Sequence, residues 1–438
     1  MNWDQLLATT RLCRPGAAYA DGRTEFQRDN DRIIFSHAFR RLANKTQVHP
    51  LSANDHVHTR LTHSIEVMSV GRSLGNLVGA KLMARGAPAA VTPDALGYAV
   101  QAACLAHDIG NPPFGHAGEE SIQRWFAGAF ARGAGQDMTA AQQADLTGFE
   151  GNAQGFRLLT QLENNKWEGG LELTHAVLGT FTKYPRAAGP RPADNYAGGK
   201  KHGYFDAERG YFEEVATALG LTPRPTPGHW SRHPLAFLVE AADDICYGVI
   251  DIEDGYELGY IRYDEAVALL ESMSGPVPFR AGMTEWDKVR KYRAWAIRAL
   301  VDAAVDAFMQ HEAALLAGTF SADLLSQTEH GPRIEAATTL ARDKIYWSER
   351  KTQLEIAGNE ILCGLLDLFG DMVADLGHAG WDAGRLVARS QKLARLVPNG
   401  FAGVTSSYDA WLRVTDFISG MTDRYALDLY RKLKGIAI

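Results

Sequence analysis

Apolar side chains recur at helical spacing along most of the chain. Between residues 95 and 106, apolar and small side chains fill nearly every position, and they follow Thr92-Pro93, a dipeptide typical of a helix start. Strand patterns do not alternate with helix patterns, so the sequence predicts an all-α fold rather than a parallel α/β fold. The other stretches with helical spacing are residues 29–43, 60–79, 149–162, 171–182, 234–254, 284–315, 331–347, 350–377, 383–396 and 407–435.

Three stretches depart from this pattern. In residues 45–59, β-branched residues alternate with polar ones around a Ser-Ala-Asn-Asp turn, which predicts a short β-hairpin. Residues 185–204 and 221–233 are rich in proline and polar residues, and we expect loops there.

Composition is that of an ordinary soluble globular protein, since 46% of the 438 residues are hydrophobic and 22% are charged. The formal net charge of -7 carries no overall electrostatic sign of nucleic-acid binding. Local basic clusters at Arg40-Arg41 and Lys200-Lys201 remain possible contact points.

Cysteine usage and hydropathy indicate the compartment. The four cysteines lie far apart and form no CxxC pair, as expected for thiols in a reducing compartment. The N-terminus has no basic stretch followed by an apolar one, and the chain contains no run of about 18 apolar residues. We therefore expect a cytoplasmic protein without a membrane partner.

The stretch LAHDIGNPPFGHAGE, residues 105–119, contains two histidines and two carboxylates that are candidates for metal binding or acid–base catalysis. The preceding helix should end at His107 and Asp108, because glycine and two prolines follow, and a new helix should start near Gly115-His116. Glu119 then lies one turn from His116. Neighbouring side chains on a helix point about 100° apart, so His107 and Asp108 bind one metal ion only if other helices supply further ligands.

Candidate ligands stand on three predicted helices: His63, the pair His107 and Asp108, and Asp243. Two histidines and two carboxylates suit Mn, Fe, Co, Mg or Zn, with positions left for water and substrate. The alternative is a buried polar network that only tethers helices.

The helix that carries Asp243 adds to the argument. Tyr247 and Asp251 follow at i+4 and i+8, so the three side chains share one face. A polar stripe inside so apolar a helix is difficult to explain by packing alone.

These residues lead to a resemblance. The H…HD…D pattern resembles the HD superfamily of metal-dependent phosphohydrolases. The strings FRRLANKTQV, RLTHSIEV, AHDIGNPPFGHAGE, FEGNAQGFR, TKYP, EAADDICYGVIDIED and GMTDRYA resemble its dGTPase branch, in order, from about residue 28 to residue 427. The resemblance implies an HD-type helical core over residues 28–260, preceded by an irregular arm over residues 1–27. A helical C-terminal region over residues 261–438 would pack on the core and contribute to oligomer contacts.

The resemblance also implies roles for individual residues. His63, His107, Asp108 and Asp243 match the ligands of a divalent metal, with Mn, Mg, Co or Fe all open. His116 is similar to the family's catalytic histidine, and Glu119 can orient it through its other ring nitrogen.

A second set matches substrate contacts of the family. Gln47 and Val48 resemble the pair near the sugar, although a hairpin residue and a core valine explain them equally well. The GMTDRYA string also reads as helix packing with a Thr-Asp cap. The residues matched to phosphate or sugar contacts are Arg60, Asn111, Lys183, Tyr247 and Asp251.

The activity implied is metal-dependent hydrolysis of deoxynucleoside triphosphates, with dGTP favoured, to deoxynucleoside and triphosphate. Two alternatives stay open: an HD phosphodiesterase acting on a nucleotide second messenger, and a non-catalytic sensor of nucleotides or single-stranded nucleic acid. The family further implies a homo-oligomer, with a hexamer favoured, and single-stranded DNA as a possible effector.

Overall fold

The computed structural model describes residues 1–14, 22–47, 58–164, 166, 168–194, 196–346 and 349–436. Helices dominate these residues, and their only β-structure consists of isolated bridges, so the all-α prediction is confirmed. The α-helices are α1 (Trp3–Leu6), α2 (Glu25–Ile34), α3 (His37–Arg41), α4 (Arg60–Ala84), α5 (Pro93–Ala106), α6 (Gly115–Ala131), α7 (Ala140–Thr147), α8 (Gly151–Arg157), α9 (His175–Phe181), α10 (Arg209–Ala218), α11 (Ala236–Glu257), α12 (Tyr263–Ser274), α13 (Glu285–Ala317), α14 (Gly331–Ala341), α15 (Glu349–His378), α16 (Ala388–Ala394), α17 (Ser407–Ser419) and α18 (Asp423–Leu433).

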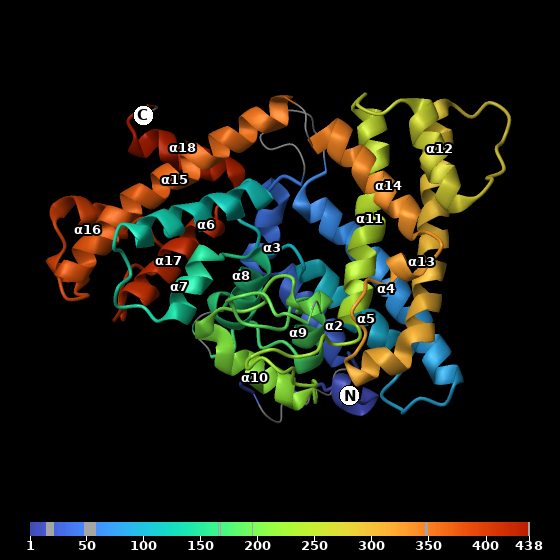
Figure 1. Cartoon of the computed structure of the whole chain (residues 1–438), viewed down its shortest axis with the longest axis horizontal. Coiled ribbons are helices and arrows are strands. Elements are labelled where there is room, and N and C mark those ends of the chain that lie inside the picture. Colours follow the sequence, from blue (N-terminus) through green and yellow to red (C-terminus); the bar gives the residue numbers. More distant parts are fainter. Residues whose placement is uncertain are drawn as a thin grey trace.

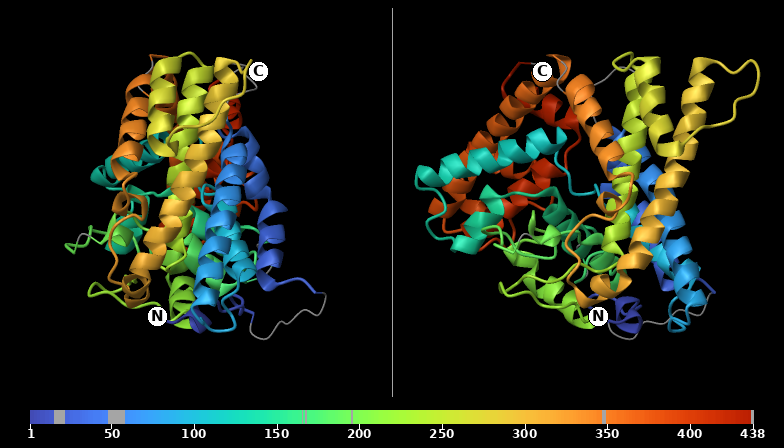
Figure 2. Two further views of the ribbon diagram at one scale, coloured as in Figure 1. Left: turned by 90° about the vertical axis from the view of Figure 1, so that its right-hand side faces the viewer. Right: turned by 45° about the vertical axis from the view of Figure 1, so that its right-hand side comes forward.

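Two hydrophobic clusters organise the helices. The first lies among α4, α5, α11, α13 and their neighbours, which stand side by side on the right of Figure 1 and in both views of Figure 2. The second lies among α6, α15, α17 and α18, on the left of Figure 1. Each cluster joins helices from distant parts of the chain, so α6 packs with the C-terminal helices although it follows α5 directly. The division at residues 27 and 260 stays a prediction.

Helices α4 and α5 approach each other closely because glycines line the contact. A Cβ atom on Gly75 would lie 2.7 Å from the carbonyl oxygen of Leu96, and one on Gly79 would lie 2.8 Å from Cα of Pro93. Any larger residue would force the backbones apart. The close packing brings the start of α4, with His63, to the end of α5, with His107.

The stretch predicted as one helix over residues 29–43 is two helices. Ser36 ends α2 and caps α3, because its hydroxyl donates to the carbonyl of Ile33 and accepts from the amide of Phe39. Such a local hydrogen-bonding alternative competes with a continuous helix, and the apolar periodicity does not reveal it.

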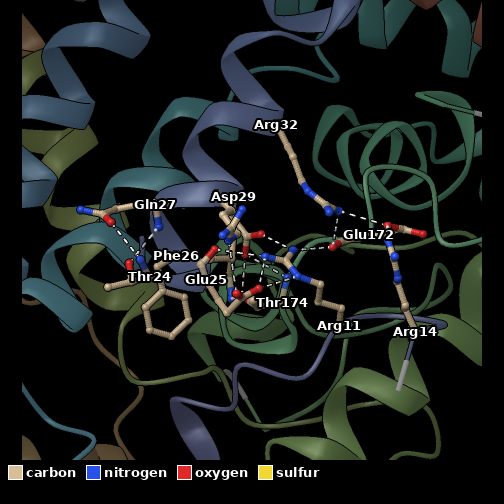
Figure 3. Close-up of polar contacts among 12 residues, drawn as sticks. Arg11, Arg14, Thr24, Glu25, Phe26, Gln27, Asp29, Arg32, Glu172 and Thr174 are labelled. Carbon is tan, nitrogen blue, oxygen red and sulfur yellow. Dashed lines mark hydrogen bonds and ion pairs between the residues drawn. The ribbon is translucent and has the colours of Figure 1, made fainter. Parts of the chain in front are cut away.

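The N-terminal stretch, predicted as an irregular arm, contains α1 and a buried ion-pair network around Arg11 (Figure 3). The Arg11 guanidinium lies 2.6 Å from Oδ1 of Asp29 and 2.6 Å from Oε2 of Glu25, both on α2. It also donates to the carbonyl of Glu172, while Thr174 donates to Asp29 from its amide and hydroxyl. The network fastens the N-terminus to the body of the protein.

Only the two ends of the stretch predicted as a hairpin, residues 45–59, are described, so the hairpin stays a prediction. Thr46 and Thr59 form an antiparallel bridge, and residues 48–57, with the predicted sugar contact Val48, lie outside the described residues. The described helices include none with the length and hydropathy of a membrane-spanning segment.

Candidate active site

Side chains from three helices meet in one cluster: His63 on α4, His107 at the C-terminal cap of α5, and Asp243 on α11. The Nε2 atoms of His63 and His107 lie 3.0 Å and 3.7 Å from Oδ1 of Asp243. The potential ligand atoms of the three residues all lie within 4.8 Å of one another. Two imidazole nitrogens and a carboxylate oxygen suit a divalent transition-metal ion.

A backbone carbonyl orients His107 for this role. Nδ1 of His107 lies 2.7 Å from the carbonyl oxygen of Cys104, one turn earlier on α5. Because a carbonyl only accepts, Nδ1 donates, and the lone pair of Nε2 is left for the cluster. Burial raises the pKa of Asp243, but the hydrogen bond from His63 and the nearby imidazoles outweigh it and hold the pKa at about 2. The carboxylate is therefore ionised at neutral pH.

Asp108 lies beside the cluster with partners of its own. Its Oδ1 lies 3.6 Å from Nε2 of His107 and accepts from the side-chain Nδ2 of Asn111 at 2.5 Å. Its Oδ2 accepts from Arg60 at 2.6 Å. Burial raises the pKa of Asp108, but Arg60 and the imidazoles outweigh it, so the pKa lies well below its ordinary value. The structure thus brings three of the four predicted ligands together and places the fourth at their edge.

His116 and Glu119 form a hydrogen-bonded pair on the first turn of α6, with 2.7 Å between Nδ1 and Oε2. The amide of Gly151 donates to the other carboxylate oxygen at 2.8 Å. The hydrogen bond to Glu119 raises the pKa of His116 above its ordinary value. This pair has the geometry of an oriented acid–base histidine.

The turn before His116 requires glycine at position 115. Gly115 has a φ of +60°, and a Cβ atom there would lie 2.7 Å from Nη2 of Arg60. Any other residue would be strained and would also displace the guanidinium. Gly115 therefore allows Arg60 to lie against the backbone that carries His116.

A cavity of about 350 Å³ is lined by the cluster and by His116. Pockets for small molecules have volumes of about 300–1,000 Å³, so the space suits part or all of a small ligand. Cationic side chains line it together with carboxylates: Lys183 lies 3.4 Å from Glu240, and Lys351 lies 3.7 Å from Glu355. The cationic lining residues are Arg60, Lys183, Lys201 and Lys351.

The other predicted substrate contacts divide into two groups. Gln47, Asn111 and Tyr247 line the cavity, and the Tyr247 ring stands edge-on to the His63 ring at a centroid distance of 6.4 Å. Asp251 is buried two turns beyond Asp243 and is not among the described lining residues. Its negative charge acts on Lys351 instead. Burial lowers the pKa of Lys351, and the charges of Glu355 and Asp251 partly offset this effect.

Several lining residues escaped the site prediction. Lys201 lies 3.0 Å from Glu150 and 4.0 Å from Glu119, so it contacts the His116–Glu119 pair from a loop. Its only signal in the sequence was the basic dipeptide Lys200-Lys201. Tyr184 follows Lys183 in the TKYP string, and Lys351 belongs to α15, whose helical pattern gives no sign of a contact with the site residues, all of which precede it in the chain by a long stretch.

The chain is similar to known proteins over nearly its whole length. The HD domain family matches residues 60–192, and the phosphohydrolase-associated domain family matches residues 332–432. A protein of Pseudomonas aeruginosa named deoxyguanosinetriphosphate triphosphohydrolase-like is 44% identical over 99% of both chains. A protein of the same name from Synechocystis sp. is 40% identical over the full length of both. A Klebsiella pneumoniae protein named deoxyguanosinetriphosphate triphosphohydrolase is 32% identical over 94% of each.

Proposed function

The chain belongs to the deoxyguanosinetriphosphate triphosphohydrolase-like family of HD-domain proteins, and on that premise we propose that it hydrolyses deoxynucleoside triphosphates in a metal-dependent reaction. The favoured substrate is dGTP, and the products are the deoxynucleoside and inorganic triphosphate. One observation carries the proposal: the cluster of His63, His107 and Asp243 opens into the same cavity as His116 and the cationic side chains.

The metal would be held by His63, His107 and Asp243. Asp108 would be the fourth ligand once one of its carboxylate oxygens gives up its present hydrogen bond to Arg60 or Asn111. Mn, Mg, Co and Fe are the candidates. Such an ion would supply positive charge that polarises the α-phosphate and lowers the pKa of an attacking water. The chemistry of the donor atoms and the fixed Nε2 of His107 support the assignment.

The side chains of the chain itself have separate roles in this proposal. Arg60 and Lys183 bind the phosphates, since a guanidinium and an ammonium group match phosphate oxygens in charge and hydrogen bonding. A water oxygen bonds to the α-phosphorus and stays on the released triphosphate, while the water gives up one proton to the solvent. As the bond between the α-phosphorus and the 5′-oxygen breaks, protonated His116 gives its proton to the 5′-oxygen. Glu119 holds the imidazole oriented and favours its protonated form.

The deciding experiment supplies purified protein with one metal at a time and measures triphosphate and nucleoside release from the four dNTPs. Triphosphate release that stops when the metal is chelated is the expected result. Release from none of the four dNTPs with any of Mn, Mg, Co or Fe contradicts the proposal. Cleavage of a cyclic or pyrophosphorylated nucleotide would then identify a second-messenger phosphodiesterase, and nucleotide binding without a product would identify a sensor.

We further propose a homo-oligomer, with a hexamer favoured, in the cytoplasm. Exposed apolar side chains on the long C-terminal helices support subunit contacts, among them Trp295 on α13 and Ile356 on α15. All four cysteines are free, which fits a reducing compartment. A stable monomer in light scattering contradicts the oligomer, and cell fractionation tests the compartment.

Single-stranded DNA is the proposed effector. If adding it leaves the rate of triphosphate release unchanged, this proposal is wrong.

A further inference from the structure

Asp423 is a buried carboxylate that joins two walls of the cavity from the far end of the chain. It is the first residue of α18 and belongs to the GMTDRYA string, and it is 3% exposed. Its Oδ1 accepts from the amide of Phe114 at 3.0 Å, and its Oδ2 accepts from the amide of Thr46 at 3.0 Å. Capping of α18 does not need this carboxylate, because Thr422 caps the helix.

The bond to Phe114 acts on the turn that carries His116. Phe114 has a φ of +64°, in the left-handed region that residues other than glycine adopt rarely. Such a conformation persists when surrounding contacts impose it, and a carboxylate on the amide is one of these contacts. Phe114 stands two residues before His116, so Asp423 fixes the direction in which α6 begins.

The bond to Thr46 acts on the opposite wall. Thr46 precedes Gln47, which lines the cavity. The Oε1 atom of Gln47 is buried and has no hydrogen-bond partner among the described residues, so it is available to a ligand. One side chain thus sets the spacing between the His116 turn and Gln47.

Lys45 completes the arrangement with a buried amino group, whose pKa burial lowers to about 7. This group donates to the carbonyl of Asn111 at 2.5 Å and to the carbonyl of Ser419, at the end of α17, at 2.7 Å. Its own carbonyl accepts from the amide of Arg60, where α4 begins. Lys45 therefore connects the turn after Asp108 to the helix that carries His63.

We propose that Asp423 and Lys45 are positioning residues for the hydrolysis proposed above, on which this inference rests for its kinetic part. Neither residue lines the cavity, so neither touches the substrate. Together they hold the His116 turn, the Gln47 segment and the start of α4 in one arrangement, and they make catalysis depend on the docking of α17 and α18. The function of the GMTDRYA string is then to align the site.

The test compares Asp423→Asn and Asp423→Ala with Thr422→Ala. Asparagine keeps the shape but has one accepting oxygen, so one of the two amides loses its acceptor, whereas alanine leaves both without one. We expect kcat to fall by about a hundredfold in Asp423→Ala, the size of effect that misplacement by about 1 Å produces, and by less in Asp423→Asn. KM should change less than kcat, because the cationic lining residues stay in place. Thr422→Ala removes the cap of the same helix and should lower the melting temperature with kcat unchanged.

Amide hydrogen exchange supplies a readout that needs no activity. In both Asp423 variants and in Lys45→Met, peptides covering residues 109–120 should exchange faster than in the wild type, and Thr422→Ala should match the wild type. Unchanged exchange with unchanged kcat in Asp423→Asn, or an equal loss of kcat in Thr422→Ala, overturns the positioning role. If the wild type releases no triphosphate, the proposed function fails, and the exchange data still decide whether the turn depends on Asp423.

Discussion

His116 and Glu119 share a 2.7 Å hydrogen bond although one side chain faces solvent and the other is enclosed. The His116 side chain is 76% exposed and that of Glu119 is 5% exposed. Burial alone would raise the pKa of Glu119, but the His116 hydrogen bond, the His116 charge and Lys201 outweigh it and lower that pKa. An ionised, fixed carboxylate thus stands behind an imidazole that lines the cavity.

The pH dependence of turnover should report this pair. In Glu119→Gln the main cause of the raised His116 pKa is removed, so that pKa should fall. If protonated His116 is the active form, activity is lost as pH rises through this pKa, and the alkaline limb of the kcat profile should move to lower pH. Glu120→Gln, on the exposed neighbouring residue, is the matched control. An alkaline limb that stays in place in Glu119→Gln removes Glu119 from this role.

Metal retention should separate the ligands from the acid–base pair. His63→Ala, His107→Ala, Asp243→Ala and Asp108→Ala should each lose bound metal and turnover, because each removes one ligand of a small set. His116→Ala should retain the metal, while its rate falls by about a hundredfold to ten-thousandfold. Elemental analysis of the purified variants measures this directly. A normal metal content in Asp108→Ala would restrict the ligand set to the three residues that already lie together.

The Arg11 network should contribute strongly to stability. Arg11→Met leaves the carboxylate of Asp29 buried without its cation, which should lower the free energy of unfolding by about 3–5 kcal/mol. Arg14→Met is the control, because the ion pair of Arg14 with Glu172 is partly exposed and such pairs contribute about 0–1 kcal/mol. Denaturant titration of both variants provides the comparison. Equal losses in the two would show that burial of the Arg11 pair has no special weight.

Local signals in the sequence predicted much of the framework. Thr92-Pro93 marked the start of α5, where the Thr92 hydroxyl accepts from the amide of Ala95. The glycine and prolines after Asp108 marked the end of this helix and the start of α6. Helical patterns placed His63, His107 and Asp243 on three helices, and the structure brings their ligand atoms together. Their roles in metal binding remain predictions.

Contacts between distant segments left no such signal. The bonds of Asp423 to Phe114 and Thr46 span 309 and 377 residues, and no periodicity relates these positions. Lys201 reaches Glu119 from a loop whose path depends on tertiary packing. Ser36 interrupts an apolar pattern that stays continuous across it, since a capping hydroxyl changes the backbone without changing the periodicity.

Discrimination between deoxyribose and ribose is the last property that the site should show. Gln47 and Tyr247 line the cavity, and the Tyr247 ring is held edge-on to His63, so a sugar next to the metal would lie against them. A site that excludes the ribose 2′-hydroxyl by shape alone discriminates only moderately against GTP. Discrimination is stronger where binding of the wrong sugar would leave buried polar groups of the site without hydrogen-bond partners. We therefore expect Gln47→Ala and Tyr247→Ala to lower the ratio of kcat/KM for dGTP over GTP by about tenfold or more. Tyr247→Phe keeps the ring and therefore separates the effect of its shape from that of its hydroxyl.

The measurement compares kcat/KM for the four dNTPs and GTP with one metal. Equal cleavage of GTP and dGTP by the wild type contradicts a role of Gln47 and Tyr247 in excluding ribose. If dGTP is the poorest substrate among the dNTPs, the proposed base preference is wrong, while the proposed metal chemistry is unaffected.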